Sequence, residues 1–367
     1  MILMNDFKAE PQALRDAMMA AAGRVFASGW FVLGRECREF ESSWAARCGV
    51  RRTVGVANGL DAIELILRAL DIGPADQVIT TPMTALATVL AILRAGATPV
   101  LADIDPDTGL LDPESVERCI GPRTRAVLVV HLYGQVRQMA RWQYLCKHHR
   151  LALIEDCAQS HLAVSNATVA GAFGVAGAYS FYPTKNLGAV GDAGAVVTQD
   201  DALADHIASL RNYGQSERYH HPLLGMNSRL DELQAALLSE RLRWLDAFTE
   251  RRREIAERYR EHLHHEGVRL LAAPESPEAH VHHLFVVRCE RRDALAAHLA
   301  AEGVQTLIHY PVAAHMQPPC IGMPRDPKGL VHAEAHAAHC VSLPCHPQMS
   351  DDDVARVIDA VNGFPLR

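Results

Sequence analysis

Short runs of β-branched and aliphatic residues alternate with amphipathic stretches across residues 53–200. The amphipathic stretches, at 61–69, 85–95 and 141–149, repeat their apolar positions at helical spacing. This alternation is typical of βαβ units, so we predict an α/β domain whose mainly parallel central sheet has helices on both faces. The runs predicted as strands span residues 53–56, 78–81, 98–102, 126–130, 152–155, 177–181 and 194–198.

The pattern changes in the last third of the chain. Helical periodicity runs over residues 231–265, too long for one compact helix, so we predict a long, bent connecting helix that leads out of the α/β domain. Later patterns predict a smaller α+β domain, with strands at 283–288 and 304–309 and helices at 292–301 and 351–361. The predicted domains are a large one at 1–245 and a small C-terminal one at 246–367.

Composition narrows the class of partner. The net charge is -7 and the one basic cluster is Arg251–Arg253, which disfavours binding to nucleic acid. No apolar stretch approaches the roughly 20 residues that span a bilayer, so we expect no membrane partner. The N-terminal segment carries acid where a signal peptide would carry basic residues, which favours the cytoplasm.

Cysteine and histidine usage gives no metal signature. The nine cysteines are scattered, with no CxxC pair, which is typical of reduced thiols and argues against structural zinc. Many of the 20 histidines stand in adjacent pairs, and neighbouring residues seldom face one ligand on a helix or strand. We therefore predict no metal site.

One lysine has unusual neighbours. In SFYPTKNLGAVGDAGAVV (180–197), Lys185 lies between a short apolar run and a string of glycines. An ordinary surface turn would explain it. The alternative is a partly buried lysine whose pKa is lowered by desolvation, so that its amine attacks a carbonyl.

Two further segments offer groups that would complement such a lysine. In VANGLDAIELILRAL (56–70) a helix follows Asn58-Gly59 at once, giving either an anion site or a plain turn with a helix cap. In LIEDCAQSHLA (153–163), Asp156 ends an apolar run, at the edge where open α/β sheets bind ligands. Asp156 would pair with a protonated pyridine nitrogen, with Gln159 donating to a nearby ring oxygen, or would cap the next helix.

A third segment, GMNSRLDELQAA (225–236), places Asn227 and Ser228 before a helix, where ordinary capping is the plain explanation. Taken together in this order and spacing, the segments resemble the DegT/DnrJ/EryC1/StrS sugar aminotransferases. The resemblance covers nearly the whole chain and includes further blocks, at residues 28–41, 131–135, 210–215 and 306–317.

The resemblance implies a homodimer of fold type I, aspartate aminotransferase-like, that binds pyridoxal 5'-phosphate (PLP). Lys185 would carry the cofactor and Asp156 would hold its pyridine nitrogen protonated. The remaining cofactor contacts are expected at Asn58, Gly59, Leu60, Ala85, Gln159, Ser180 and Asn227, with Ser180 and the amides near Gly59 on the phosphate. Asn227 would reach the phosphate of the partner subunit. Candidate substrate contacts are Trp30, His161, Asn186, Tyr219, His309, Tyr310 and His315.

Two positions depart from the family pattern. Leu60 stands where a threonine is usual, which removes one hydroxyl but leaves the backbone contact with phosphate. Ala85 stands where an aromatic ring stacks on the pyridine, an interaction worth about 0.5–1.5 kcal/mol beyond area burial. Met83 and Leu86 are the two candidates to cover the ring face instead.

The implied activity is amino transfer to a nucleotide-linked keto-sugar, with a dTDP-3-keto-6-deoxyhexose as the expected acceptor. Glutamate is the expected donor, leaving 2-oxoglutarate. A 4-keto sugar is the first alternative. Relatives that deoxygenate sugars replace the lysine, so Lys185 argues against that chemistry, while Ala85 leaves a non-catalytic, regulatory PLP-binding protein as an alternative.

Overall fold

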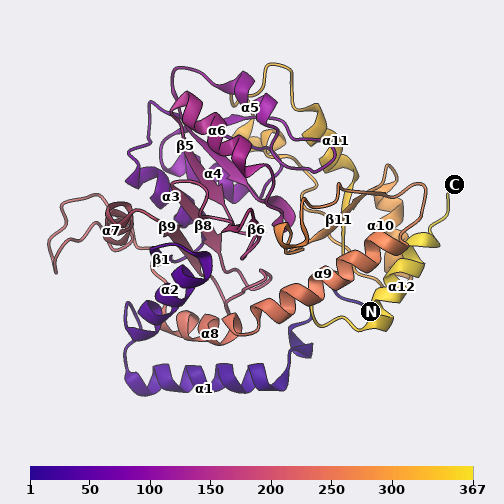
Figure 1. Ribbon diagram of the computed structural model, residues 1–367, viewed down its shortest axis with the longest axis horizontal. Helices are drawn as coiled ribbons and strands as arrows, with labels where there is room; N and C mark the ends of the chain where they lie inside the picture. The colour runs from indigo at the N-terminus through magenta and orange to yellow at the C-terminus, as the bar shows by residue number, and fades with distance from the viewer. Residues whose placement is uncertain (367) are drawn as a thin grey trace.

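The computed structural model describes residues 1–366 and has a seven-stranded sheet at its centre (Figure 1). Its strand order is β1-β9-β8-β5-β4-β2-β3. Neighbouring strands from β8 to β3 pair in parallel, and β9 runs antiparallel to both of its neighbours. The predicted mainly parallel sheet is thereby confirmed. The strands are β1 (Arg52–Val56), β2 (Gln77–Thr80), β3 (Thr98–Leu101), β4 (Thr124–Val130), β5 (Ala152–Asp156), β8 (Ala176–Ser180) and β9 (Gly194–Thr198).

Helices bury both faces of this sheet, because successive strand side chains point to opposite sides. In β4, Val127 and Val129 join one apolar cluster, while Ala126 and Leu128 join another. The first cluster includes residues of α2 (Arg35–Cys48), α5 (Pro113–Cys119), α6 (Met139–His149) and α8 (Glu232–Leu242). The second includes residues of α3 (Gly59–Ala69), α4 (Leu86–Arg94) and α7 (Asp201–Leu210).

The helical pattern over 231–265 resolves into two helices, α8 and α9 (Leu245–His262). The backbone N–H groups of Arg243 and Trp244 bond three residues back, to Glu240 and Arg241, which tightens the last turn of α8 and ends it. The prediction of one bent helix is therefore corrected to two helices. Helix α1 (Gln12–Ser28) packs along α8 through Ala21 and Val25 (Figure 1).

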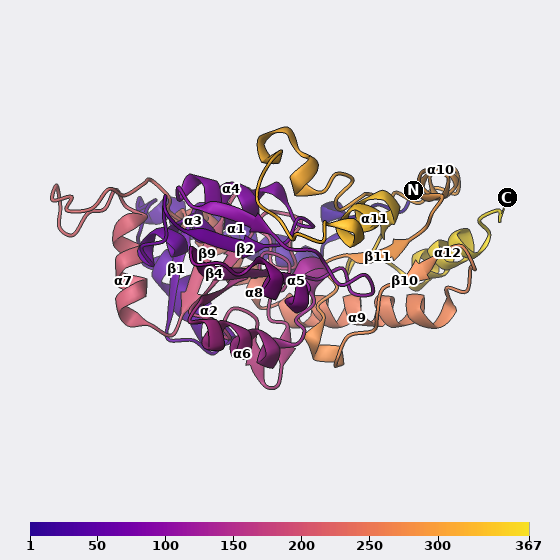
Figure 2. The same cartoon turned by 90° about the horizontal axis from the view of Figure 1, so that it is seen from above.

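A second, antiparallel sheet lies at the end of the molecule opposite α7 (Figure 2). It contains β10 (Arg269–Leu270), β11 (Phe285–Arg288) and β12 (Cys340–Leu343). Helices α9, α10 (Arg292–Ala301) and α12 (Asp351–Asn362) pack with it. The remaining elements are α11 (Val331–His339), the hairpin β6 (Val164–Ser165) and β7 (Thr168–Val169), and the 3-10 turns η1 (Phe7–Ala9), η2 (Leu132–Gly134), η3 (Pro277–Ala279), η4 (Ala314–Met316) and η5 (Pro318–Cys320).

The strand predicted at 304–309 is wrong. This segment makes two isolated bridges, Val304 to Ile2 and Leu307 to Ser342, and no continuous ladder. The strand that follows β11 in the chain is instead β12, whose four residues all pair with β11. A run of apolar residues predicts burial, but the pairing partner is decided by segments distant in sequence.

The predicted domain boundary coincides with the start of α9 and stays a prediction. The C-terminal apolar cluster gathers Ile255, Phe285, Leu299 and Val357, and the N-terminal Ile2 packs into it as well. Arg367, the end of the predicted small domain, lies outside the described residues. None of the helices in the described part of the chain is long and apolar enough to cross a membrane.

Candidate active site

Lys185 and Asp156 meet at the carboxyl ends of adjacent parallel strands. Asp156 is the last residue of β5, and Lys185 follows the end of β8 in a turn. Desolvation lowers the pKa of the Lys185 amine to about 8, against an opposing effect from the Asp156 carboxylate. Within residues 1–366 the amine has no hydrogen-bond or ion-pair partner, and the side chain is partly buried. These properties favour the reactive lysine over the ordinary surface turn.

The Asp156 carboxylate is buried and held from two sides. Thr88 Oγ1 donates to Oδ2 at 2.8 Å, and the backbone N–H of Ala158 donates to Oδ1 at 3.1 Å. Burial raises the pKa of Asp156, while the Thr88 and Ala158 bonds and the Lys185 charge lower it. No regular helix follows Asp156, so its alternative role as a helix cap is excluded. A buried carboxylate of this kind suits a cationic ring nitrogen.

Thr88 was missed by the sequence analysis. It lies in the first turn of α4, and its hydroxyl also shares a 2.7 Å hydrogen bond with Thr84 Oγ1. The two threonines stand four residues apart in TALAT, with Thr84 just before α4 and Thr88 in its first turn. That spacing was the available signal, but only the tertiary structure brings the pair against Asp156.

An anion cradle forms where α3 starts beside the end of β8. Asn58 Oδ1 accepts from the backbone N–H of Asp61 at 2.8 Å, so the capping role of Asn58 is confirmed. Among the described residues, the N–H groups of Gly59 and Leu60 have no acceptor. A Cβ on Gly59 would lie 2.7 Å from the Ser180 Cβ, so only glycine allows this approach. The two free amides and the Ser180 hydroxyl together suit a phosphate.

These features fit PLP group by group. The cofactor carries a carbonyl, a ring nitrogen that takes a proton, and a phosphate. The chain offers an amine of lowered pKa, a buried carboxylate and an anion cradle at one end of the sheet. The residues present therefore fit the cofactor.

Gln159 is fixed at both ends of its side chain. Its Oε1 accepts from the backbone N–H of Tyr133 at 2.6 Å, and its Nε2 donates to Tyr310 Oη at 3.2 Å. The second hydrogen on Nε2 remains for a ring oxygen, so the predicted contact stays compatible with this geometry. Tyr310 is thereby placed next to the candidate cofactor site.

Of the two residues that were candidates to cover the ring face near Ala85, the structure favours one. Met83 is fully buried and packs with Val89, Leu101 and Val130 in another apolar cluster. It cannot cover a ring in the active site. Leu86 is partly exposed at the start of α4, next to Ala85, and is the candidate that remains.

The prediction that His161 contacts the substrate is corrected. Its side chain has no exposed surface and sits among the rings of Trp44, Tyr179 and Phe181. Its Nε2 donates to the Ser180 carbonyl at 3.0 Å. The ring supports the segment that carries Ser180 and does not face an open site.

The Asn186 side chain forms hydrogen bonds within the protein and is not free to bind a ligand. Its Nδ2 donates to the Val281 carbonyl at 2.8 Å, and its Oδ1 lies 3.3 Å from His283 Nδ1. His283 was missed, because the adjacent pair with His282 was considered only as a metal ligand. Burial and the nearby Lys185 charge hold the pKa of His283 well below its usual value. A neutral imidazole therefore flanks the lysine.

Of the other substrate candidates, His309 lies near the lysine, and burial and the Lys185 charge lower its pKa to about 4. His309 Nδ1 is 2.8 Å from Ser342 Oγ, and His315 Nε2 is 3.0 Å from Glu334 Oε1. Trp30 and Tyr219 are exposed on separate segments, the first between α1 and α2 and the second between α7 and α8. Asn227 is exposed too, and its side chain has no hydrogen bond within residues 1–366.

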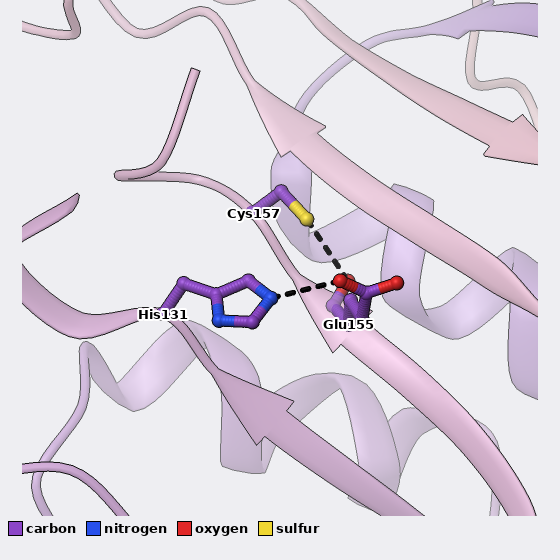
Figure 3. A group of neighbouring side chains, drawn as sticks. All are labelled: His131, Glu155 and Cys157. Carbon is purple, nitrogen blue, oxygen red and sulfur yellow. Dashed lines mark hydrogen bonds and ion pairs between the residues drawn. The ribbon is translucent and has the colours of Figure 1, made fainter. Parts of the chain in front are cut away.

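A neighbouring cluster of His131, Glu155 and Cys157 resembles a metal site in composition (Figure 3). Glu155 has no exposed surface. Its Oε1 accepts from the N–H groups of Phe173 and Gly174, and its Oε2 accepts from the N–H of Gly171 and lies 2.9 Å from His131 Nε2. Burial and the two carboxylates keep the pKa of the Cys157 thiol well above its usual value. A carboxylate surrounded by donors and a protonated thiol disfavour a cation.

Comparison with known proteins covers the whole fold. The sequence pattern of the DegT/DnrJ/EryC1/StrS aminotransferase family matches residues 12–362. A dTDP-3-amino-3,6-dideoxy-alpha-D-galactopyranose transaminase from Aneurinibacillus thermoaerophilus is 44% identical over 367 residues, which is 99% of each chain. A dTDP-3-amino-3,4,6-trideoxy-alpha-D-glucose transaminase from Streptomyces venezuelae is 45% identical over 364 residues, 99% of this chain and 96% of that one. The crystal structure of S. venezuelae DesV with a ketimine intermediate has a TM-score of 0.96 at 44% identity, covering 100% of this chain and 99% of that one.

Proposed function

Because the chain belongs to the DegT/DnrJ/EryC1/StrS aminotransferase family, we propose that it converts the 3-keto group of a dTDP-linked 6-deoxyhexose into an amine. Enzymes of this family are PLP-dependent sugar aminotransferases, and the fold is their fold type I. The observation that carries the proposal is the partly buried Lys185, with its pKa lowered to about 8, facing the buried Asp156. The choice of sugar rests on the two transaminases named above, which both carry a dTDP-linked 3-amino sugar in their names.

When bound, PLP supplies an electron sink that allows a proton to leave the carbon bearing the amino group. Lys185 Nζ is the group that takes this proton and returns it, because an amine with a pKa of about 8 is partly deprotonated near neutral pH. Asp156 holds the positive charge on the ring nitrogen, and Thr88 orients the carboxylate for it. The Gly59 and Leu60 amides with Ser180 bind the phosphate.

Two further parts of the proposal concern partners. Glutamate serves as amino donor and leaves as 2-oxoglutarate. The active unit is a homodimer in which Asn227 reaches the partner's phosphate. The exposed, unpaired Asn227 side chain supports the shared site, as do the exposed apolar residues Trp30, Phe31, Tyr213 and Leu224. The nine cysteines are all free, which supports a reducing cytoplasm.

A substrate panel tests the proposal. The purified protein is incubated with glutamate and with dTDP- and UDP-linked sugars that carry a keto group at C3 or at C4. We expect a mass change to the amino sugar, largest for the dTDP-linked 3-keto-6-deoxyhexose, and none with Lys185→Ala. Preferred turnover of a 4-keto sugar would contradict the proposed position, and preference for the UDP series would contradict the proposed nucleotide.

A further inference from the structure

A small cavity lies where the large sheet's loops meet the C-terminal part of the chain. Its volume is about 20 Å³. This is room for one particle of the size of a water molecule, and it excludes polyatomic ligands such as phosphate. The walls come from the loop between β3 and α5, from η2 and the residue after it, from α9, from β11 and from the segment between α9 and β11. The lining residues are Thr108, Tyr133, Gln135, Arg260, Leu271, Ala272, His280, His282, Leu284, Phe285 and Val286.

Three lining residues carry buried polar atoms with no hydrogen-bond partner in the described part of the chain. They are Gln135 Nε2, Arg260 Nε and His282 Nδ1. The side chains of Gln135 and His282 are only 4% and 6% exposed. Buried polar atoms without partners are rare in native proteins and point to a bound water or ion. Their grouping around one cavity indicates a single occupant.

Arg260 makes this a positively charged site. Its two Nη atoms donate to the carbonyls of Leu271 and Ala272, at 3.1 and 3.2 Å. No carboxylate among residues 1–366 lies within ion-pair distance of this guanidinium. Burial and the charge of Arg137 lower the pKa of Arg260, and no carboxylate in that part of the chain offsets them. A partly buried guanidinium without a counter-charge is costly, so an anion would stabilise it.

The stacked imidazoles of His280 and His282, with centroids 3.8 Å apart, strengthen this conclusion. His280 Nδ1 accepts from the backbone N–H of His282 at 2.9 Å, so the proton of the neutral ring is on Nε2. Burial, followed by the charges of His282, Arg260, Arg253 and Arg137, keeps the pKa of His280 well below its usual value. Both rings therefore stay neutral in a positive surrounding, where His280 offers a further N–H donor.

We propose that this cavity binds one halide ion, chloride under ordinary conditions, with Arg260, Gln135, His280 and His282 as its donors. A water molecule accepts two hydrogen bonds and must place two hydrogens of its own, which suits a wall rich in donors less well than a halide does. The ion links α9 to the loop that contains Tyr133, whose backbone N–H holds Gln159. It is a structural counter-ion at the junction, and it takes no part in the amino transfer.

Unfolding of the PLP-loaded protein tests the site in solution. Sodium chloride, bromide and gluconate are compared at equal ionic strength. We expect chloride and bromide to raise the unfolding temperature and to saturate, with an unfolding equilibrium shifted about elevenfold at ten times the dissociation constant. Gluconate should lack the saturating component. Equal stabilisation by all three salts would overturn the proposal.

Variants and a bromide soak locate the effect. Arg260→Gln should abolish the halide-specific shift, while Arg123→Gln, at an exposed arginine remote from the cavity, should keep it. Because Arg260 also holds two carbonyls, Gln135→Leu provides a second variant that should weaken the shift. Anomalous scattering from a bromide-soaked crystal should peak between Arg260 and Gln135. Water alone at that point, or bromide only at soaking concentrations without a saturable shift in solution, would refute the site.

Discussion

Three groups proposed for the cofactor and two proposed for the substrate lie on different kinds of structure. Asp156 ends β5, Ser180 ends β8 and Gly59 starts α3, so the cofactor groups are attached to buried elements of one sheet. Trp30 and Tyr219 instead lie on exposed segments. Figures 1 and 2 show the chain between α7 and α8 leaving the body of the molecule as an extended loop.

This difference indicates which part of the site is completed by one chain alone. The cofactor groups are held by hydrogen bonds and packing within the chain, as Thr88 holds Asp156 and His161 holds the Ser180 carbonyl. The exposed substrate candidates contact only residues close to them in sequence, since Trp30 Nε1 donates to the Val32 carbonyl and Arg218 lies over the Tyr219 ring. Rigid elements position catalytic groups, and loops provide the contacts that vary with the substrate.

The largest effect is expected from Lys185→Ala, which removes the group that moves the proton. Turnover should fall by at least about 10⁴-fold, measured as amino sugar formed in a single-turnover assay. Borohydride should attach the cofactor to the peptide that contains Lys185 in the wild-type protein. Lys147→Ala, at an exposed position on α6, is the matched control and should keep activity. Labelling at Lys147 would refute the assignment.

Asp156→Ala should lower turnover by about 10²–10³-fold, because the ring nitrogen loses the charge that keeps it protonated. Initial rates at saturating PLP measure the effect. Cys157→Ala, the adjacent buried residue, is the control and should change the rate little. Equal, small effects of both substitutions would contradict the role given to Asp156.

Mixed dimers test whether a second chain completes the site. Lys185→Ala and Asn227→Ala chains, each weak or inactive alone, should form hybrids in which one site has both residues intact. The mixture should recover activity at limiting PLP, where loss of one phosphate contact costs about tenfold in affinity. If native mass spectrometry shows hybrids and activity does not recover, the site is not shared.

Thr88→Val should change the pH profile more than the maximal rate. The Thr88 bond lowers the pKa of Asp156, so its loss should raise that pKa. The protonated, inactive carboxyl would then persist to higher pH, and the acidic limb of kcat/KM should move upward. Thr84→Val, which removes a neighbouring hydroxyl without a bond to Asp156, should move it less. An unshifted acidic limb in Thr88→Val would count against this coupling.

The smallest effect is expected at Ala85. With Met83 buried elsewhere, Ala85→Phe should restore stacking and slow PLP loss on dialysis, by up to about tenfold in affinity. Leu86→Ala should speed the loss, because Leu86 is the remaining side chain that covers the ring. Faster loss from Ala85→Phe would mean that the space is already filled and the added ring overpacks it.

The sequence by itself determined the alternating elements of the sheet and the family, and it predicted the residues proposed for the cofactor. Each of these depends on local signals, such as an apolar run, an Asn-Gly turn before a helix, or a lysine between aromatic and glycine residues. The same signals did not predict β12, because a strand's place depends on the partner available to it, and Leu307 and Ser342 meet in a single bridge. Nor did they predict that α8 ends at Leu242, because the helical spacing of apolar residues continues into α9.

Only the tertiary structure decided which side chains meet. Thr88 and Asp156 are 68 positions apart in the sequence, yet they form a 2.8 Å hydrogen bond because the fold brings the start of α4 to the end of β5. The sequence does not distinguish the surroundings of His161 from those of His283. In the structure His161 is enclosed by aromatic rings, whereas His283 flanks Lys185. The burial of a side chain and the choice of its partner depend on segments distant in sequence, so a local pattern does not predict them.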